Sequence, residues 1–185
     1  GDLDVVAGSN DIYTGLKGSR GSDEIAWFEN EGNDANWTKT VLSNDAIEGG
    51  RGVEVADMDG DGDLDVLVAS FGISHFSTAD GDDSKIVWYE NNGAANPSFT
   101  QTVLVTNNAG AHSVQPVDLD HDGDMDFVVA DRDTGATGGN VSWWENDGAA
   151  DPSWSVRSID VEALGAAEIS IADIAIWRTM GWMVS

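Results

Sequence analysis

The stretch Gly62-Asp63-Leu64-Asp65-Val66-Leu67 decides the fold, because it occurs in three versions in this chain of 185 residues. An earlier copy reads Gly1-Asp2-Leu3-Asp4-Val5-Val6, and a later copy reads Gly123-Asp124-Met125-Asp126-Phe127-Val128. The copies begin at residues 1, 62 and 123, so the period is 61 residues. Self-similarity at a fixed period of this size is typical of repeat architectures, in which each repeat is one structural unit.

Three further runs, rich in β-branched and aromatic residues, accompany each copy. They lie at 25–30, 86–91 and 141–146, then at 37–42, 99–104 and 154–159, and finally at 53–57, 114–118 and 169–173. Gly, Asn, Asp and Ser fill the gaps, as in turns between strands. Four antiparallel strands in each unit of about 60 residues predict the blades of an all-β propeller. A sandwich or an open solenoid explains the four-strand period less well.

In each unit a short polar segment joins the run at 25–30, 86–91 or 141–146 to the run that follows it, and these two runs are the expected third and fourth strands of a blade. It reads Glu29-Asn30-Glu31-Gly32, then Glu90-Asn91-Asn92-Gly93, then Glu145-Asn146-Asp147-Gly148. We expect hairpin turns here, because Asn and Gly accept a positive φ at little cost. The aromatic residues before these turns, Trp27, Trp88 and Trp143, are expected to pack between neighbouring blades.

Two nine-residue loops, 57–65 and 118–126, carry the densest charge in the chain. Both read D-x-D-x-D-G-x-x-D, and five carboxylates so close together repel one another unless a cation neutralises them. Alternating carboxylates, a Gly for a sharp turn and a closing Asp form a cage of hard oxygens that suits Ca²⁺. An EF-hand is excluded, because loop position 12 is Val68 or Val129 rather than the Glu that such a loop requires.

We therefore predict two calcium sites per chain. The backbone carbonyls of Asp63 and Asp124 are expected to complete them, with both side chains directed outward. The expected side-chain ligands are Asp57, Asp59, Asp61 and Asp65 in the first loop and Asp118, Asp120, Asp122 and Asp126 in the second.

These loops, the apolar strand after each of them and the Trp-aromatic-Glu-Asn run resemble the FG-GAP/VCBS repeat family. That family includes integrin alpha-chain propellers and many secreted bacterial proteins. The resemblance covers the chain up to Asp173, and it divides residues 1–174 into repeats at about 1–50, 51–111 and 112–174. It implies a propeller in which calcium ties the first two strands of each blade together, in a secreted or cell-surface protein. Residues 175–185 form an apolar tail unlike any repeat.

The strand count amounts to about three blades, whereas propellers typically have 4–8. The first unit begins at the Gly of an acidic loop, so Asp2 and Asp4 lack the upstream ligands. One hypothesis is that the chain is a fragment of a longer propeller. The other is a homodimer with a six-bladed ring, in which each chain donates 169–173 to the incomplete blade of its partner.

Composition restricts the partners. The chain has 34 Asp and Glu against 8 Lys and Arg, a formal net charge of −26, and no Cys. This charge argues against nucleic acid and anionic membranes as ligands. The absence of Cys excludes disulfides and thiolate metal sites. No stretch approaches the ~20 apolar residues of a membrane span.

Function is expected in binding rather than in catalysis, because no catalytic motif is found among the three histidines or the glycine-rich segments. The loops at 9–23, 71–84 and 132–139 vary most between units, and function usually lies on such loops. We expect a glycan or protein ligand on this face of a non-catalytic adhesion or binding module. The alternatives are an accessory or catalytic propeller of a polysaccharide-degrading enzyme, and a purely structural fragment. The candidate ligand residues are Tyr13, Lys17, Arg20, Phe71, His75, Phe76 and Arg132.

Overall fold

A computed structural model describes most of the chain. The described residues are 2–9, 24–32, 36–44, 50–71, 84–106, 110–132, 139–149, 152–161, 163 and 165–174. They form eleven strands and no helix, so within these ranges no helix exists that is long and apolar enough to cross a membrane. The strands are β1 (Val5–Gly8), β2 (Glu24–Asn30), β3 (Trp37–Asn44), β4 (Gly50–Ala56), β5 (Asp65–Ser70), β6 (Lys85–Asn91), β7 (Phe99–Thr106), β8 (Ala111–Val117), β9 (Asp126–Asp131), β10 (Asn140–Asn146) and β11 (Trp154–Asp160).

The strands form three antiparallel sheets, each built from strands that follow one another in the sequence. The first sheet has the order β1-β2-β3, the second β4-β5-β6-β7 and the third β8-β9-β10-β11. The pairings repeat from unit to unit: Val66 lies opposite Tyr89 in the second sheet, and Phe127 opposite Trp144 in the third. The predicted all-β fold with about three blades' worth of strands is therefore confirmed, and the first sheet lacks the strand that corresponds to β4 and β8.

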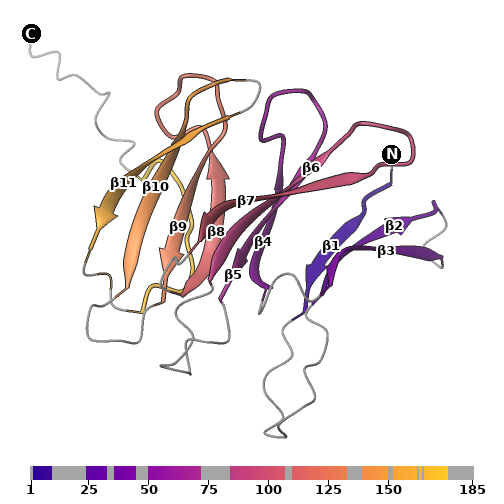
Figure 1. Cartoon of the computed structure of the whole chain (residues 1–185), viewed down its shortest axis with the longest axis horizontal. Helices are drawn as coiled ribbons and strands as arrows, with labels where there is room; N and C mark the ends of the chain where they lie inside the picture. Colours follow the sequence, from indigo (N-terminus) through magenta and orange to yellow (C-terminus); the bar gives the residue numbers. More distant parts are fainter. Residues whose placement is uncertain are drawn as a thin grey trace, which may run out of the picture.

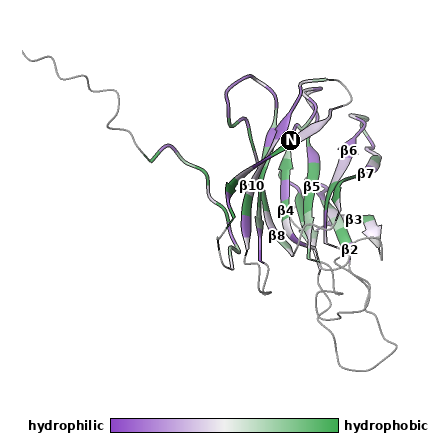
Figure 2. Ribbon diagram, turned by 60° about the vertical axis from the view of Figure 1, so that its left-hand side comes forward, coloured by the Kyte–Doolittle hydropathy of each residue, from purple (hydrophilic) through white to green (hydrophobic). Residues whose placement is uncertain are grey.

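The three sheets stand side by side in chain order, like the neighbouring blades of a propeller, and do not close into a ring (Figure 1). The inner strands lie next to each other, with β1 in contact with β4 and β4 in contact with β8. The strands carry many hydrophobic residues (Figure 2), and buried ones from neighbouring sheets pack together in shared clusters. Burial between blades therefore holds the units together.

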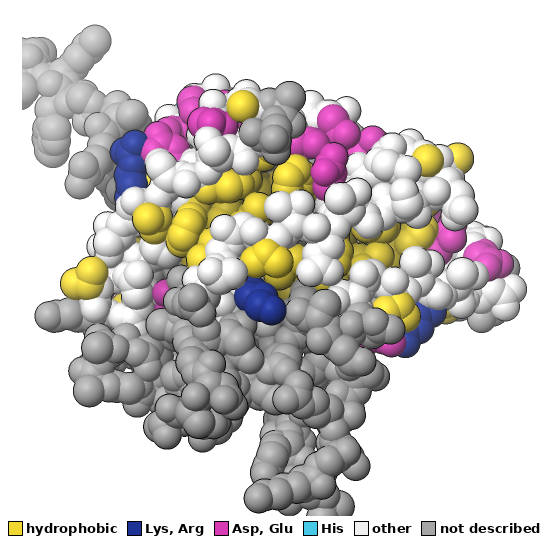
Figure 3. Space-filling view, viewed as in Figure 1, with side chains coloured by type: hydrophobic (Ala, Val, Ile, Leu, Met, Phe, Trp, Pro, Cys, Tyr) yellow, Lys and Arg dark blue, Asp and Glu magenta, His cyan; other side chains and the backbone are white. Residues whose placement is uncertain are grey.

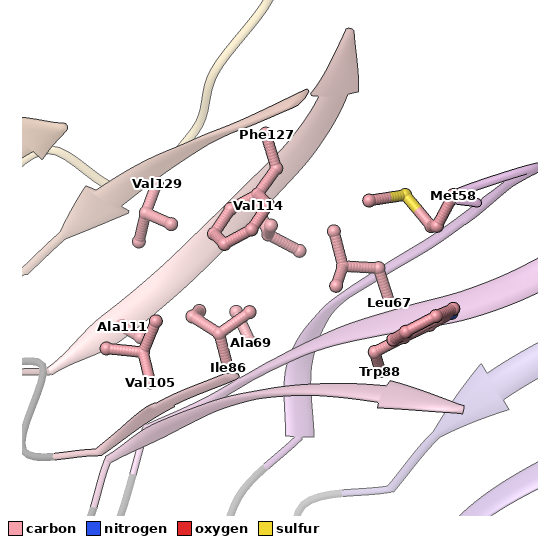
Figure 4. Packing of buried hydrophobic residues seen from close by; sticks show 10 residues of the cluster. All are labelled: Met58, Leu67, Ala69, Ile86, Trp88, Val105, Ala111, Val114, Phe127 and Val129. Atoms are coloured by element: carbon pink, nitrogen blue, oxygen red, sulfur yellow. The ribbon is translucent and has the colours of Figure 1, made fainter. Parts of the chain in front are cut away.

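Two apolar clusters occupy these interfaces. In the larger one, Leu67 and Trp88 of the second sheet meet Phe127 and Val129 of the third (Figure 4). In the smaller one, Ile25 of the first sheet packs against Val66 and Tyr89 of the second. Trp27 also reaches Phe99 of the second sheet, with ring centroids 6.3 Å apart. The prediction that the strand tryptophans pack between blades is confirmed for Trp27 and Trp88.

The hairpins that join β2 to β3, β6 to β7 and β10 to β11 differ in one detail from the expectation. Gly32, Gly93 and Gly148 adopt positive φ angles of 78°, 63° and 67°. The asparagine two residues before each glycine does not, because among the described residues only His121 is a non-glycine with positive φ. Instead, the side-chain oxygen of each asparagine accepts the N–H of its glycine, at 3.0, 3.1 and 3.0 Å. The asparagine contributes the hydrogen-bond acceptor of its side chain, as in an Asx turn.

The run at 169–173, expected to be a first-type strand, is not a strand in this structure. Residues 166–174 belong to no ladder, and the segment runs out from the body of the molecule (Figure 2). A strand needs a neighbour to satisfy its backbone groups, and none of the described strands pairs with this segment in a ladder.

Replacing Gly93 by Ala should destabilise the fold by about 1–3 kcal/mol, because alanine is strained at positive φ and its Cβ would collide with the carboxylate of Asp63. Gly165 is the matched control, since its φ is +73° and nothing lies within 4 Å of an added Cβ. Urea denaturation should show a larger loss for Gly93→Ala than for Gly165→Ala. Equal losses would show that the contact with Asp63 contributes nothing.

Candidate metal centre

Both acidic loops connect the first strand of a sheet to the second strand, and they lie at the same edge of the molecule. Loop 57–65 follows β4 and leads into β5, and loop 118–126 follows β8 and leads into β9. Their edge is uppermost in Figure 1, and acidic side chains gather along it in the space-filling view (Figure 3). Two clusters of negatively charged aspartates therefore occupy equivalent positions on neighbouring sheets.

Within each loop the first three aspartates converge. Asp57, Asp59 and Asp61 each offer a carboxylate oxygen, and these oxygens all lie within 4.8 Å of one another. Asp118, Asp120 and Asp122 form the same arrangement in the second loop. We call these sets the first and second carboxylate triads. They bring together six of the ten aspartates that the sequence singles out.

Local hydrogen bonds hold the triads in place. In the first loop the N–H of Asp61 bonds to a side-chain oxygen of Asp59 at 3.2 Å, and the N–H of Asp63 bonds to Asp61 at 2.9 Å. The second loop repeats both bonds, from Asp122 to Asp120 at 3.3 Å and from Asp124 to Asp122 at 3.0 Å. Alternating aspartates fold the backbone around their own side chains in successive Asx turns.

One carboxylate in each triad has a raised pKa. Burial raises the pKa of Asp59 above its usual value, and the charges of Asp61 and Asp57 add to the effect. The pKa of Asp120 is also raised, by loss of solvent and then by the charge of Asp122. Like charges at this separation disfavour the ionised state. A bound cation would reverse the effect, because it favours the ionised carboxylates.

The closing aspartates, Asp65 and Asp126, do not belong to the triads. Both are fully buried, with exposures of 1% and 0%. One oxygen of Asp65 accepts the N–H of Met58 at 3.1 Å, and the other accepts the N–H of Asn91 at 2.8 Å. Asp126 does the same with Leu119 at 3.2 Å and Asn146 at 2.9 Å. Each closing aspartate thus ties its loop to the hairpin of the same sheet, and its role as a calcium ligand stays a prediction.

Burial raises the pKa of Asp65 to about 6, even though the amides of Asn91 and Met58 stabilise its charge. A buried carboxylate is favourable only when its hydrogen bonds compensate for the lost water. The two amides supply part of this compensation. Nearby positive charge would supply more.

The hairpin asparagine completes a contact that the sequence analysis missed. Its backbone N–H bonds to the closing aspartate, its side-chain N–H bonds to the carbonyl of the residue before that aspartate, and its side-chain oxygen accepts the glycine N–H. We call this set the Asp–Asn–Gly clamp. It comprises Asp4, Asn30 and Gly32 in the first sheet, Asp65, Asn91 and Gly93 in the second, and Asp126, Asn146 and Gly148 in the third. Its signal in the sequence was the constant presence of all three residues in each unit.

The clamp also involves tryptophan. The indole N–H of Trp143 donates to Asp126 at 2.9 Å, and that of Trp27 donates to Asp4 at 3.2 Å. These tryptophans therefore have a polar role besides packing.

Asp63 and Asp124 are partly buried rather than directed outward. The carboxylate of Asp63 lies against Gly93, so that a Cβ on this glycine would collide with it, and Asp124 lies in the same way against Gly148. The expectation of outward side chains is wrong, because the glycine of each hairpin leaves a space that the side chain fills.

The two loops differ in how their first aspartate is satisfied. Both oxygens of Asp57 accept loop amides, from Gly60 at 2.8 Å and from Gly62 at 3.0 Å. One oxygen of Asp118 accepts the N–H of Gly123 at 3.2 Å, whereas the other, Oδ1, is buried and has no hydrogen-bond partner among the described residues. A buried carboxylate oxygen without a donor is costly unless something outside the protein binds it.

The opposite ends of the strands carry a different cluster. Arg51 of β4 and His112 of β8, which occupy corresponding positions, lie 3.4 Å apart between Nη1 and Nε2. The guanidinium lies 4.7 Å from the ring centre of Phe71, which is buried. Phe71 therefore packs against this cluster, and its role as a ligand contact stays a prediction. Arg132 is exposed, while Tyr13, Lys17, Arg20, His75 and Phe76 lie outside the described residues.

Comparison with known proteins identifies the family. A model of the FG-GAP-like repeat matches residues 1–68 and 76–129, and the chain belongs to this family. Repeats of this family are typically non-catalytic modules of extracellular proteins and often bind calcium. No curated protein and no solved structure matches the chain.

Asp126→Asn should cost about 1–3 kcal/mol of unfolding free energy even in excess chelator, because its amide group would face the N–H of Leu119 or Asn146. Asp4→Asn is the matched control, since Asp4 occupies the same clamp position but is exposed. Chemical denaturation in EDTA should give the larger loss for Asp126→Asn. A loss that occurs only in calcium would contradict the role in amide binding.

Proposed function

We propose that this chain is a calcium-stabilised, non-catalytic propeller module, with one Ca²⁺ bound at each carboxylate triad. The observation that carries the proposal is Oδ1 of Asp118. It is a buried anionic oxygen that accepts no hydrogen bond from the described residues, in a group whose three carboxylate oxygens lie within 4.8 Å of one another. Ca²⁺ accepts 6–8 oxygen ligands in a flexible geometry, so three carboxylates with loop carbonyls and water fit its needs.

The triad residues would hold the ion, and the clamp would hold the triad. Asp57, Asp59 and Asp61 supply negative charge at one end of loop 57–65, while Asp65 anchors the other end to the hairpin at Asn91. A divalent cation supplies positive charge that offsets the repulsion within the triad. Calcium binding would therefore stabilise the connection between the first two strands of a blade.

An extracellular location fits this chemistry. Extracellular calcium modules bind with dissociation constants of about 10⁻⁴–10⁻³ M, so millimolar calcium keeps them loaded. A chain without cysteine has no disulfides to stabilise it outside the cell, and metal sites can take that role. Two ions would change the formal charge from −26 to −22.

Calcium should raise the melting temperature, and EDTA should lower it again. At a calcium concentration 100 times the dissociation constant, each site would add ~2.7 kcal/mol. Asp59→Asn and Asp120→Asn should each remove part of this gain, and in EDTA both should be as stable as the unchanged chain or more so, because each removes a like charge. Glu168→Gln, an exposed acid outside both loops, is the control. A melting temperature that chelation leaves unchanged would contradict the proposal.

The proposed role of the module is recognition of a glycan or a protein at the edge opposite the acidic loops. The segments at 9–23, 71–84 and 132–139, which lead from β1 to β2, from β5 to β6 and from β9 to β10, differ in length between the units. Strand register places their attachment points, such as Ser70 and Lys85, at the far end from loop 57–65. Variable loops on a rigid scaffold are where binding usually resides.

Glycan-array binding without turnover is the expected result for a binding module. A panel of polysaccharides incubated with the same protein should yield no reducing ends above the level of a boiled control. Release of oligosaccharides would instead support the alternative, an accessory or catalytic domain of a polysaccharide-degrading enzyme. Nucleic acid included on the array should give no signal, because the net charge is strongly negative.

A further inference from the structure

Met58 connects the first carboxylate triad to the neighbouring sheet. It lies between Asp57 and Asp59 in the sequence, yet its side chain is only 1% exposed, whereas both aspartates are half-buried. The side chain belongs to the larger apolar cluster, together with Val114 and Phe127 of the third sheet (Figure 4). A residue of loop 57–65 is therefore part of the core between two blades.

Both backbone groups of Met58 are also hydrogen-bonded, one to each sheet. Its N–H donates to the closing aspartate of its own sheet, Asp65, at 3.1 Å. Its carbonyl accepts a side-chain N–H of Asn146 in the third sheet at 3.4 Å. Asn146 is buried, with an exposure of 4%, and the same amide group donates to the carbonyl of Met125 at 3.2 Å. The clamp of the third sheet thus reaches across the interface to the acidic loop of the second.

Leu119 occupies the same position in the second loop and differs in its contacts. Its N–H donates to the closing aspartate Asp126 at 3.2 Å, as that of Met58 does to Asp65. Its side chain, however, is only half-buried and lies outside both apolar clusters of the described residues. The two loops therefore share their local hydrogen bonds, and within the described part of the chain they differ in their contact with a neighbouring sheet.

We propose that Met58 and Asn146 are positioning residues for the first calcium site, so that the affinity of this site depends on the packing of the third sheet. This inference rests on the proposed function, which places Ca²⁺ at the first triad. The carboxylates of Asp57 and Asp59 are attached to the backbone on either side of Met58. A loop that is already fixed at this point loses less conformational entropy when the ion binds, and binding is correspondingly tighter.

The dependence acts in both directions. If the interface between two blades strengthens calcium binding by some factor, calcium strengthens the interface by the same factor, because the two free energies are linked. Calcium at the first triad would then stabilise the contact between the second and third sheets, in addition to the connection between the first two strands of one blade.

Calorimetric titration with calcium tests the role of Met58. The titrated chain carries Asp120→Asn and Asp122→Asn, so that the second triad is removed and the first site is measured alone. Adding Met58→Ala should weaken binding about tenfold, within the usual range of coupling between sites. Met58→Leu should retain most of the affinity, because substitutions that conserve volume are tolerated in a core.

The matched control is Leu119→Ala in a chain that carries Asp59→Asn and Asp61→Asn, in which only the second site remains. Its affinity should stay nearly unchanged, because Leu119 belongs to neither cluster. Equal losses for Met58→Ala and Leu119→Ala would overturn the inference alone, since calcium would still bind. A chain that binds no calcium at either triad would refute the proposed function, and the inference with it.

A pair of milder substitutions tests the third sheet directly and serves if Met58→Ala does not fold. Val114 of β8 and Val87 of β6 are equally buried, with exposures of 1% and 0%, and neither belongs to an acidic loop. Val114 lies in the cluster that contains Met58, whereas Val87 lies in the cluster between the first and second sheets. Val114→Ala should weaken the first site several-fold more than Val87→Ala does. Equal affinities of these two variants would overturn the inference.

Discussion

The hydrogen bond from the N–H of a hairpin asparagine to a single aspartate is the interaction on which each blade depends. It measures 2.8, 2.8 and 2.9 Å at Asp4, Asp65 and Asp126. The aspartate begins the second strand of a blade, and the asparagine ends the third. In the second and third sheets the same aspartate also accepts an amide of the acidic loop. One buried carboxylate therefore fixes the loop, the strand and the hairpin relative to one another. The residue two positions after the asparagine must be glycine, because a side chain at that position would collide with a neighbouring carboxylate.

This arrangement gives the acid-rich composition a physical meaning. The aspartates of a loop divide into those that face one another and one that faces the protein. The triads concentrate negative charge without a balancing side chain, whereas the closing aspartate is compensated by amides. Asp118 shows the imbalance most plainly, because one of its oxygens is buried and accepts no hydrogen bond in the part of the chain that the structure describes. In the first loop, glycine amides reach both oxygens of Asp57, so the second loop is the one in which a cation is needed most.

The sequence predicted the fold well because periodicity reports directly on the units. The repeat of 61 residues and the four apolar runs per unit led to the observed strands, and the D-x-D-x-D-G pattern led to both triads. The clamp was missed, because each of its residues has an ordinary local explanation and only the folded structure shows that they meet. The side chains of Asp63 and Asp124 were misplaced for the same reason: the space that receives them belongs to a glycine 30 residues away in one case and 24 in the other. The segment at 169–173 has a strand sequence, but a strand also requires a neighbour.

A crystal structure grown in calcium would test the central claim most directly. The account predicts one ion at each triad, about 2.3–2.6 Å from the carboxylate oxygens, with Oδ1 of Asp118 among its ligands and the amide contacts of Asp65 and Asp126 retained. Triads without an ion in crystals that hold millimolar calcium would contradict it.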